Sequence, residues 1–157
     1  MTTAEQPNLT NEAEELIEDA MAAVKPSEEI ETVLAGIAED NKVMVAESQG
    51  SRIWQFEYGS ATVFVQLTGE TDEDTMTVWS PILQLPAKNE AQLMKKMLQM
   101  NWLSTFESHF AIAENQVVVV SSRILADISA SEISRIITIV ATIADDNDDN
   151  FKAEYGQ

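Results

Sequence analysis

The sequence predicts an α+β domain with a single antiparallel β-sheet and flanking helices, in the order α-(α)-β-β-β-α-β-β-α. Residues 52–86 contain three consecutive β-type runs separated by turn signals, and residues 108–121 contain two more. Helical periodicity precedes the first group of runs, separates the two groups and follows the second. The chain of 157 residues has the length of one ordinary domain.

Two helices are predicted before the strands. Residues 11–24 combine a helical apolar stripe with acidic residues in the first turn, where the helix dipole favours anions, and Pro26 ends this segment. Ser27 is the predicted N-cap of a second helix that runs to about Glu39. The stripes are Leu16, Ile17, Met21 and Val24 in the first helix and Ile30, Val33, Leu34 and Ile37 in the second.

The first long strand of the three-strand stretch carries aromatic side chains at alternate positions. Trp54, Phe56 and Tyr58 are separated by single polar residues, so all three face the same side of the sheet. The next two residues, Gly59 and Ser60, suit a type II′ hairpin turn because glycine adopts the positive φ that its first position needs. The chain is therefore expected to return directly in an antiparallel strand.

The strands around this hairpin follow the same alternation. Residues 42–47 are expected to form a short strand or an extended lead-in, and residues 75–83 the third strand of the meander. Pro81 has no backbone N–H, so it is expected at an edge, a bulge or a strand end. In the strand after the turn, Val63, Val65 and Leu67 share one face and Phe64 points to the other.

A methionine-rich helix is predicted over residues 90–103. Asn89 is its expected N-cap, with Gln92 at the position that completes a capping box. Its apolar residues cover a wider arc than one sheet face needs, so part of the arc is free for another contact. The arc consists of Leu93, Met94, Met97, Leu98 and Met100.

The last hairpin and helix complete the domain. Residues 117–120 are all valine, which predicts a strand that is central or covered on both faces. Ser129 and Glu132 have capping-box spacing and begin a helix that is expected to fray at the acidic run 145–150. We expect an acidic N-terminal extension at 1–26, a folded domain at 27–145 and an acidic, frayed tail at 146–157.

The composition limits the classes of partner. The 27 acidic residues against 9 basic ones give a net charge of -18, which repels nucleic acid and anionic membranes. This charge favours a basic or unfolded polypeptide partner, or serves only solubility. The absence of cysteine excludes disulfides, thiolate nucleophiles and cysteine-ligated metals. No signal peptide and no membrane-spanning run is apparent, so a cytoplasmic location is expected.

No catalytic, cofactor or metal site is predicted. His109 is the only histidine, and it lies in a predicted strand without a nucleophile motif, which favours a structural role. Asp145, Asn147 and Asp149 match the first ligand positions of a calcium loop, but the glycine and the bidentate glutamate that such a loop needs are missing. A solvated acidic helix end is the better interpretation.

The methionine-rich helix is the main candidate for a binding surface. Its methionines are soft, adaptable side chains of the kind that promiscuous peptide binders use, although they also serve as core residues against a sheet. The candidate partner-binding residues are Met94, Met97, Met100, Trp102, Trp54 and Trp79.

Three segments resemble the bacterial YbjN-like family: FEYGSATVFVQL, VWSPILQLP and QLMKKMLQMNWLSTFESHFAIAENQVVVVSSRILADISASEI. The resemblance covers about residues 27–145 and includes Arg123 and Asp127 before the last helix. That family is grouped by fold with type III secretion chaperones. The resemblance implies an α-β-β-β-α-β-β-α domain, often dimeric, that binds protein or acts in regulation and has no enzymatic residues.

The leading hypothesis is a non-catalytic, chaperone-like or regulatory module that binds a protein or peptide through an apolar surface, with a homodimer as the expected oligomeric state. The alternative is a ligand-sensing or enzymatic domain with a pocket between sheet and helices. Its candidate walls are Trp54, Tyr58, Trp79 and His109. A structural subunit of a larger assembly is a third possibility.

Overall fold

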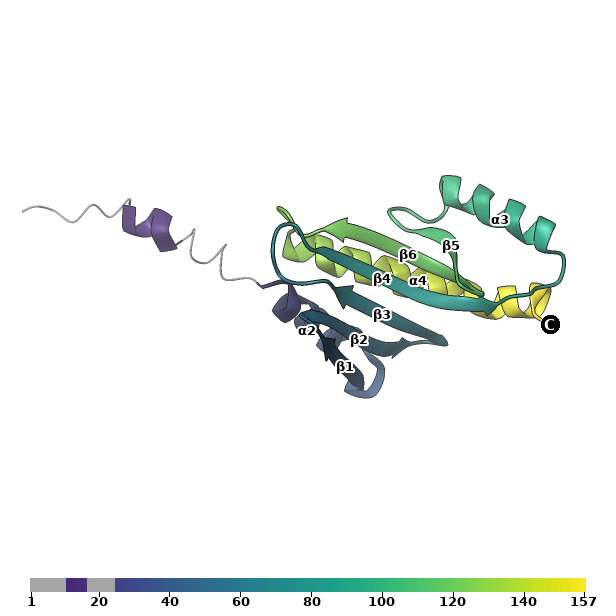
Figure 1. The fold of residues 1–157 in the computed structure, drawn as a ribbon, viewed down its shortest axis with the longest axis horizontal. Helices are drawn as coiled ribbons and strands as arrows, with labels where there is room; N and C mark the ends of the chain where they lie inside the picture. Colours follow the sequence, from purple (N-terminus) through teal and green to yellow (C-terminus); the bar gives the residue numbers. More distant parts are fainter. Residues whose placement is uncertain (1–10, 17–24) are drawn as a thin grey trace, which may run out of the picture.

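A computed structural model describes residues 11–16 and 25–157 of the chain, and within them a six-stranded antiparallel sheet in the order β1-β2-β3-β4-β6-β5 (Figure 1). This confirms the predicted fold class. Residues 11–16 are helical, and the rest of the predicted first helix lies outside the described residues. The elements are α2 (Pro26–Ile37), η1 (Glu39–Asn41), β1 (Val43–Ser48), β2 (Ser51–Tyr58), β3 (Ala61–Leu67), β4 (Thr75–Gln84), α3 (Glu90–Leu103), β5 (His109–Ala113), β6 (Gln116–Ile124) and α4 (Ala130–Tyr155).

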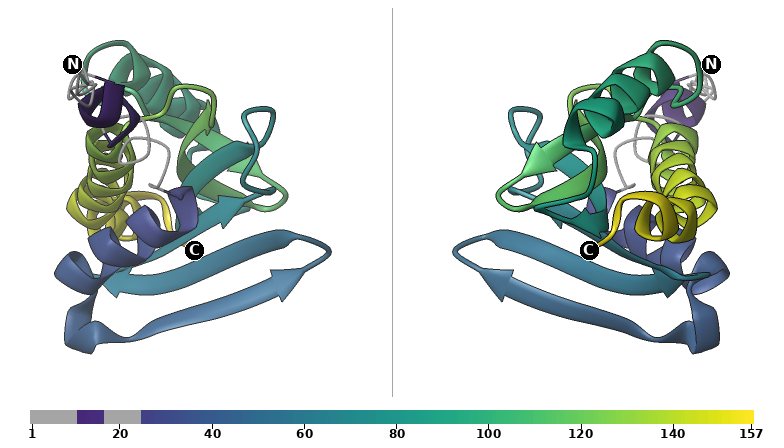
Figure 2. Two further views of the ribbon diagram at one scale, coloured as in Figure 1. Left: turned by 90° about the vertical axis from the view of Figure 1, so that its left-hand side faces the viewer. Right: turned by 90° about the vertical axis from the view of Figure 1, so that its right-hand side faces the viewer.

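Helices α2 and α4 cover one face of the sheet, and the core lies between them and the strands (Figure 2). Trp54 and Phe56 of β2 point into this core and are 0% and 2% exposed, as their alternation predicts. The inward-facing residues of β3 are equally buried, whereas Phe64 lies on the other face and stacks on Trp79 with ring centroids 5.2 Å apart. The period-two pattern thus identified the inner face correctly.

The turn between β2 and β3 is held by the last helix. Gly59 has a φ of 58°, and a β-carbon at this position would clash with the carboxylate of Asp145. The Ser60 N–H donates to Asp145 Oδ1 over 2.9 Å, and the Ser60 hydroxyl donates to Asp148 Oδ1 over 2.7 Å. The positive φ favours glycine at this position, and a larger residue would also displace the Asp145 carboxylate that holds the turn.

Other strand predictions hold as well. Residues 43–48 form β1, which pairs with β2. Pro81 lies at a register shift between β4 and β6, as a proline inside a sheet requires. β6 lies between β4 and β5, and Val117, Val118 and Val119 are buried, which confirms the prediction of a central strand.

One predicted helix cap is wrong, and a second lies at the predicted position but makes no side-chain bond. Ser27 is already inside α2, whose first position is Pro26, and its N–H and hydroxyl donate to Glu70. Asn89 has a left-handed φ of 49° and makes no side-chain capping bond; Glu90 Oε1 accepts from the N–H of residue 87 instead. In α2, the Glu70 carboxylate therefore accepts from a backbone N–H of the first turn in place of a local cap.

The predicted N-cap of the last helix, Ser129, is confirmed, but the second half of the capping box is not formed, because the Glu132 carboxylate pairs with Arg123 and accepts from the Ser129 hydroxyl. The N–H of Glu132 donates to Ser129 Oγ over 3.1 Å, and α4 begins at the next residue after Ser129. This cap satisfies one of the backbone donors that the first turn of a helix leaves open.

The predicted end of the last helix is wrong. α4 does not fray at residues 145–150 but continues to Tyr155, so residues 146–157 are not a loose tail. Phe151 and Tyr155 are each 1% exposed, and Phe151 stacks on Phe110 with ring centroids 5.4 Å apart. The Tyr155 carbonyl accepts from the N–H of Lys88 over 2.7 Å. Packing of these aromatic rings outweighs the unfavourable position of the acidic residues near the helix end.

Candidate interaction surface

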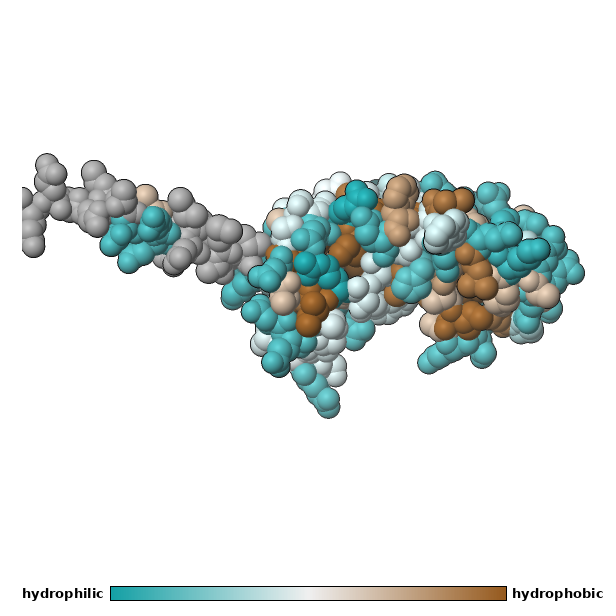
Figure 3. Space-filling view, turned by 90° about the horizontal axis from the view of Figure 1, so that it is seen from above, coloured by the Kyte–Doolittle hydropathy of each residue, from teal (hydrophilic) through white to brown (hydrophobic). Residues whose placement is uncertain are grey.

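α3 buries one side and presents a large apolar area on the other. Leu93 and Met97 face the core and are 0% and 5% exposed. In Figure 3, hydrophobic atoms gather on the right-hand side of the molecule, where α3 faces the viewer. The exposed residues are Leu98 (71%), Trp102 (82%), Leu103 (81%) and Phe106 (77%), and we call these four the α3 patch.

Helix geometry explains the α3 patch. Leu98 and Trp102 are four residues apart, so their side chains lie one above the other on the same helix face. With Lys95 and Gln99 they line a shallow, mostly apolar hollow. Phe106 follows in the loop after the helix, with a left-handed φ of 52°. Contiguous exposed apolar residues of this size mark interaction sites in soluble proteins.

The predicted partner-binding residues do not form one surface in the structure. Trp102 belongs to the α3 patch, whereas Trp54 and Met97 are core residues and do not reach the surface. Met94 and Met100 are half-buried and pack against the core. Trp79 is half-buried on the opposite face of the sheet, as its stacking partner Phe64 is.

Of the four members of the α3 patch, only Trp102 is among the residues that the sequence predicts to bind a partner. Leu98 belongs to the predicted apolar arc, Leu103 ends the predicted helix, and Phe106 lies outside the predicted elements. The available signal was the run from Trp102 to Phe106, where three large apolar residues occur within five positions. Such a run is consistent with burial too, so only the packing of α3 decides that these side chains are exposed.

The predicted pocket between sheet and helices is not formed by its proposed walls. Trp54 and Tyr58 point from β2 towards the helices. His109 pairs with Val120, which pairs with Trp79, so His109 and Trp79 lie on the opposite face of the sheet. Within the part of the chain that the structure describes, no group of three or more histidine, aspartate or glutamate side chains is placed to hold a metal ion.

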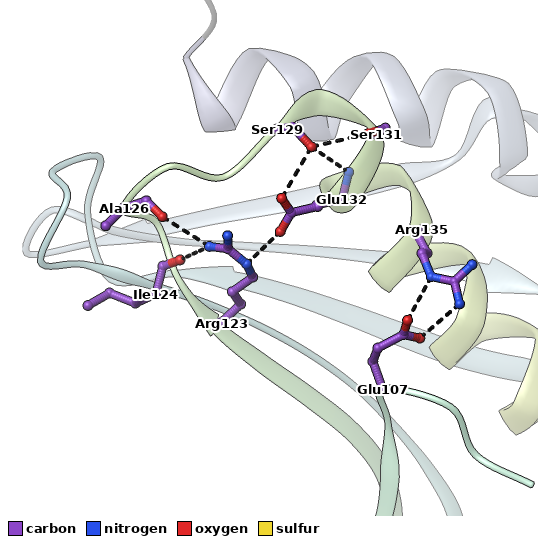
Figure 4. A network of polar contacts seen from close by, with 8 residues as sticks. All are labelled: Glu107, Arg123, Ile124, Ala126, Ser129, Ser131, Glu132 and Arg135. Carbon is purple, nitrogen blue, oxygen red and sulfur yellow. Dashed lines mark hydrogen bonds and ion pairs between the residues drawn. The ribbon is translucent and has the colours of Figure 1, made fainter.

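A polar network joins the start of α4 to β6 and to the loop before β5 (Figure 4). Arg123 Nε pairs with Glu132 Oε2 over 2.6 Å, and its Nη1 donates to the carbonyls of residues 124 and 126. Arg135 donates to both carboxylate oxygens of Glu107 over 2.8 and 3.2 Å. Each guanidinium is therefore matched by a carboxylate, so the adjoining hollow of about 230 Å³ offers little excess positive charge to an anionic ligand.

Arg135→Met is expected to raise the pKa of Glu107 towards its ordinary value. The hydrogen bonds from Arg135 lower this pKa in the folded protein. A lowered pKa means that the ion pair stabilises the fold above the unfolded-state pKa and that this contribution disappears as the pH falls through the folded-state value. An NMR titration of Glu107 in both proteins checks this, and identical titration curves would contradict it.

Comparison with known proteins identifies the family. The sequence model of the YbjN family, described as "Putative bacterial sensory transduction regulator", matches residues 26–153. This chain therefore belongs to the YbjN family. The match begins close to the expected domain start at residue 27 and extends beyond residue 145 into the second half of α4.

Comparison with solved structures finds a distant likeness. The structure described as "Crystal Structure of the ExsC-ExsE Complex" has a TM-score of 0.41 and 10% sequence identity, with 77% of this chain and 92% of that chain covered. A likeness of this degree carries no argument about function. No curated protein matches the chain. Among the described residues, no helix is both long enough and apolar enough to cross a membrane.

Proposed function

We propose that this protein is a non-catalytic binding module, chaperone-like or regulatory, that captures a polypeptide partner through the α3 patch. The observation that carries the proposal is the exposure of Trp102 and its three apolar neighbours on one side of a helix whose other side is packed into the core. Large aromatic residues surrounded by smaller apolar ones are the usual centres of binding energy in protein interfaces. The regulatory description of the YbjN family is compatible with this role.

The charge of the molecule limits which partners fit the α3 patch. α3 contains Lys95 and Lys96 and a single acidic residue, Glu90, so it is less negative than the chain as a whole. Lys96 is paired with Glu154 over 3.1 Å, which leaves Lys95 at the rim of the hollow. A partner with an apolar anchor and a neutral or acidic rim suits this surface. Nucleic acid and anionic membranes stay unfavourable because of the net charge of -18.

Trp102→Ala is expected to weaken partner capture by about thirtyfold, because truncation of a central interface tryptophan typically costs about 2 kcal/mol or more. The measurement is affinity purification of the tagged full-length protein from its native cells, followed by titration of the recovered partner against each variant. Gln92→Ala is the matched control, since Gln92 is an exposed α3 residue outside the α3 patch. Equal affinity of the Trp102→Ala protein and the control for that partner would refute the proposed function.

A homodimer and a cytoplasmic location are parts of the same proposal. Light scattering of the purified protein measures whether the mass is 17.4 kDa or twice that value. Partner capture at the α3 patch requires that Trp102→Ala leaves this mass unchanged. A dimer that becomes monomeric in the variant would assign the α3 patch to self-association and would contradict the proposed capture there.

A further inference from the structure

The two edge strands of the sheet, β5 and β1, differ in how far their free sides are available for pairing with another strand. At the β5 edge, the carboxamide of Asn101 accepts from the Phe110 N–H over 2.7 Å and donates to the Phe110 carbonyl over 3.2 Å. The side chain thus occupies the place of a further strand at Phe110. At the β1 edge, no described residue pairs with the free side of the strand, and Met44 and Val45 are 62% and 51% exposed. Natural proteins usually protect their edge strands against pairing with other chains. An open apolar edge strand is therefore a candidate site for binding a further strand.

The hairpin geometry identifies the amides that β1 offers. Gln49 and Gly50 both have positive φ, and Ser48 faces Ser51 across this two-residue turn. Residues that flank such a turn form a hydrogen-bonded pair, and hydrogen-bonded and open pairs then alternate along the strands. The amides of residues 44 and 46 therefore point to β2. Those of residues 43, 45 and 47 point to the free side, where an added strand would bind them.

A hollow lies on each side of β1. The inner one, about 280 Å³, lies between β1 and α2; its apolar lining includes Leu34, Ala35, Val45 and Trp54, and Glu31 is beside them. The outer one, about 440 Å³, is lined by β1 and β2 residues that include Met44. Successive side chains of a strand point to opposite faces. A strand added to β1 would therefore place its side chains alternately in the two hollows.

The charged residues near β1 determine which charge an added strand should carry. Arg52 is the nearest arginine, and it is already paired with Glu31 and Glu47. Lys42 at the start of β1 is the remaining basic residue there. The acidic residues around the strand are Glu31, Glu39, Asp40, Glu47 and Glu57. This excess of carboxylates favours lysine or arginine in the added strand.

The same charges disfavour two other occupants. Residues 1–24 contain six carboxylates and no lysine or arginine, so the N-terminal part of this chain carries the wrong charge for β1. A second copy paired through its own β1 would bring the same acidic neighbours towards each other. Figure 2 shows α3 and the β1–β2 hairpin at opposite ends of the molecule, so a partner at β1 leaves the α3 patch free.

We propose that β1 is a second binding site, which takes an extended segment of another protein as a seventh strand. The segment presents apolar side chains to the hollow beside α2 and a lysine or arginine to the surrounding carboxylates. Main-chain hydrogen bonds to residues 43, 45 and 47 hold it, and the inner hollow selects its side chains. This binding is independent of the α3 patch and so of the function proposed above.

The proposal is tested with a soluble peptide in which valine and threonine alternate and lysine stands at each end, added to the full-length protein. Amide hydrogen exchange measured by NMR is expected to slow at Val43, Val45 and Glu47 when the peptide is present, and to change little at Met44 and Ala46. A peptide with glutamate in place of the lysines is expected to bind at least about tenfold more weakly. Equal binding of the two peptides, or unchanged exchange at the three free-side amides, would overturn the proposal.

Two variants distinguish peptide binding at β1 from binding at the α3 patch and from pairing of β1 with a second copy or with this chain. Val45→Pro removes one free-side amide and is expected to weaken the lysine peptide about tenfold, whereas Leu98→Asp in the α3 patch is expected to leave its affinity unchanged. Circular dichroism establishes that both variants are folded. If Val45→Pro lowers the mass of a dimer, or if residue 45 is protected from exchange before peptide is added, β1 belongs to a second copy or to this chain, and the proposal is wrong.

Discussion

Phe151→Ala is expected to lower the free energy of unfolding by about 3–5 kcal/mol, as removal of a buried phenylalanine usually does. Phe151 is 1% exposed and contacts the rings of Phe110 and Tyr155, and Lys96 Nζ lies 5.3 Å from its ring centroid. The alanine variant would leave a cavity where α4, α3 and β5 meet. Urea unfolding followed by circular dichroism measures the loss.

Asn150→Ala is the matched control for this prediction. Asn150 is the preceding residue of the same helix and is exposed, so its replacement should change stability by about 0.5 kcal/mol or less. If both variants had the same small effect, the last turns of α4 would not be packed against the domain. The sequence-based expectation of a frayed tail would then be correct after all.

Met97→Asp is expected to destabilise the fold by at least about 3 kcal/mol, because it removes a buried side chain and places a carboxylate among apolar groups. Met97 is 5% exposed, whereas its neighbour Leu98 is 71% exposed. Leu98→Asp is therefore expected to change stability by only about 0.5 kcal/mol while it places a charge in the α3 patch. Thermal unfolding of the two variants measures the difference.

The different burial of Met97 and Leu98 also determines which variants can test partner binding at the α3 patch. A loss of partner capture in Met97→Asp would report unfolding, so only Leu98→Asp and Trp102→Ala examine the α3 patch itself. Equal melting temperatures of the Met97→Asp and Leu98→Asp proteins would mean that α3 is not packed through Met97. The description of the α3 patch as the outer side of the helix would then fail.

The strands could be predicted because their signals are local. The alternation around Trp54 and the turn at Gly59 require only neighbouring residues, and the four consecutive valines of β6 directly indicate burial on both faces. The N-cap at Ser129 is equally local. These features agree with one another, so the fold class follows from them without knowledge of long-range contacts.

Most of the errors involve residues whose partners are distant in the sequence. Ser27 donates to Glu70, and the acidic residues near the end of α4 accept hydrogen bonds from the turn at Ser60. Phe151 packs on Phe110 of β5. No periodicity within a single segment reveals such pairs, and the helix dipole alone favoured a frayed end. The binding surface was only partly found for the same reason: periodicity places Met97 and Leu98 in one arc, and the packing of α3 separates them.

The position of α4 has a consequence for how the chain is made. This helix is the last element in the sequence, yet it covers the inner faces of β2, β3, β4 and β6. While the ribosome synthesises the protein, only α2 can cover the apolar side of the meander until residues 130–155 emerge. A newly made chain therefore passes through a stage at which part of this apolar surface is exposed and prone to aggregation.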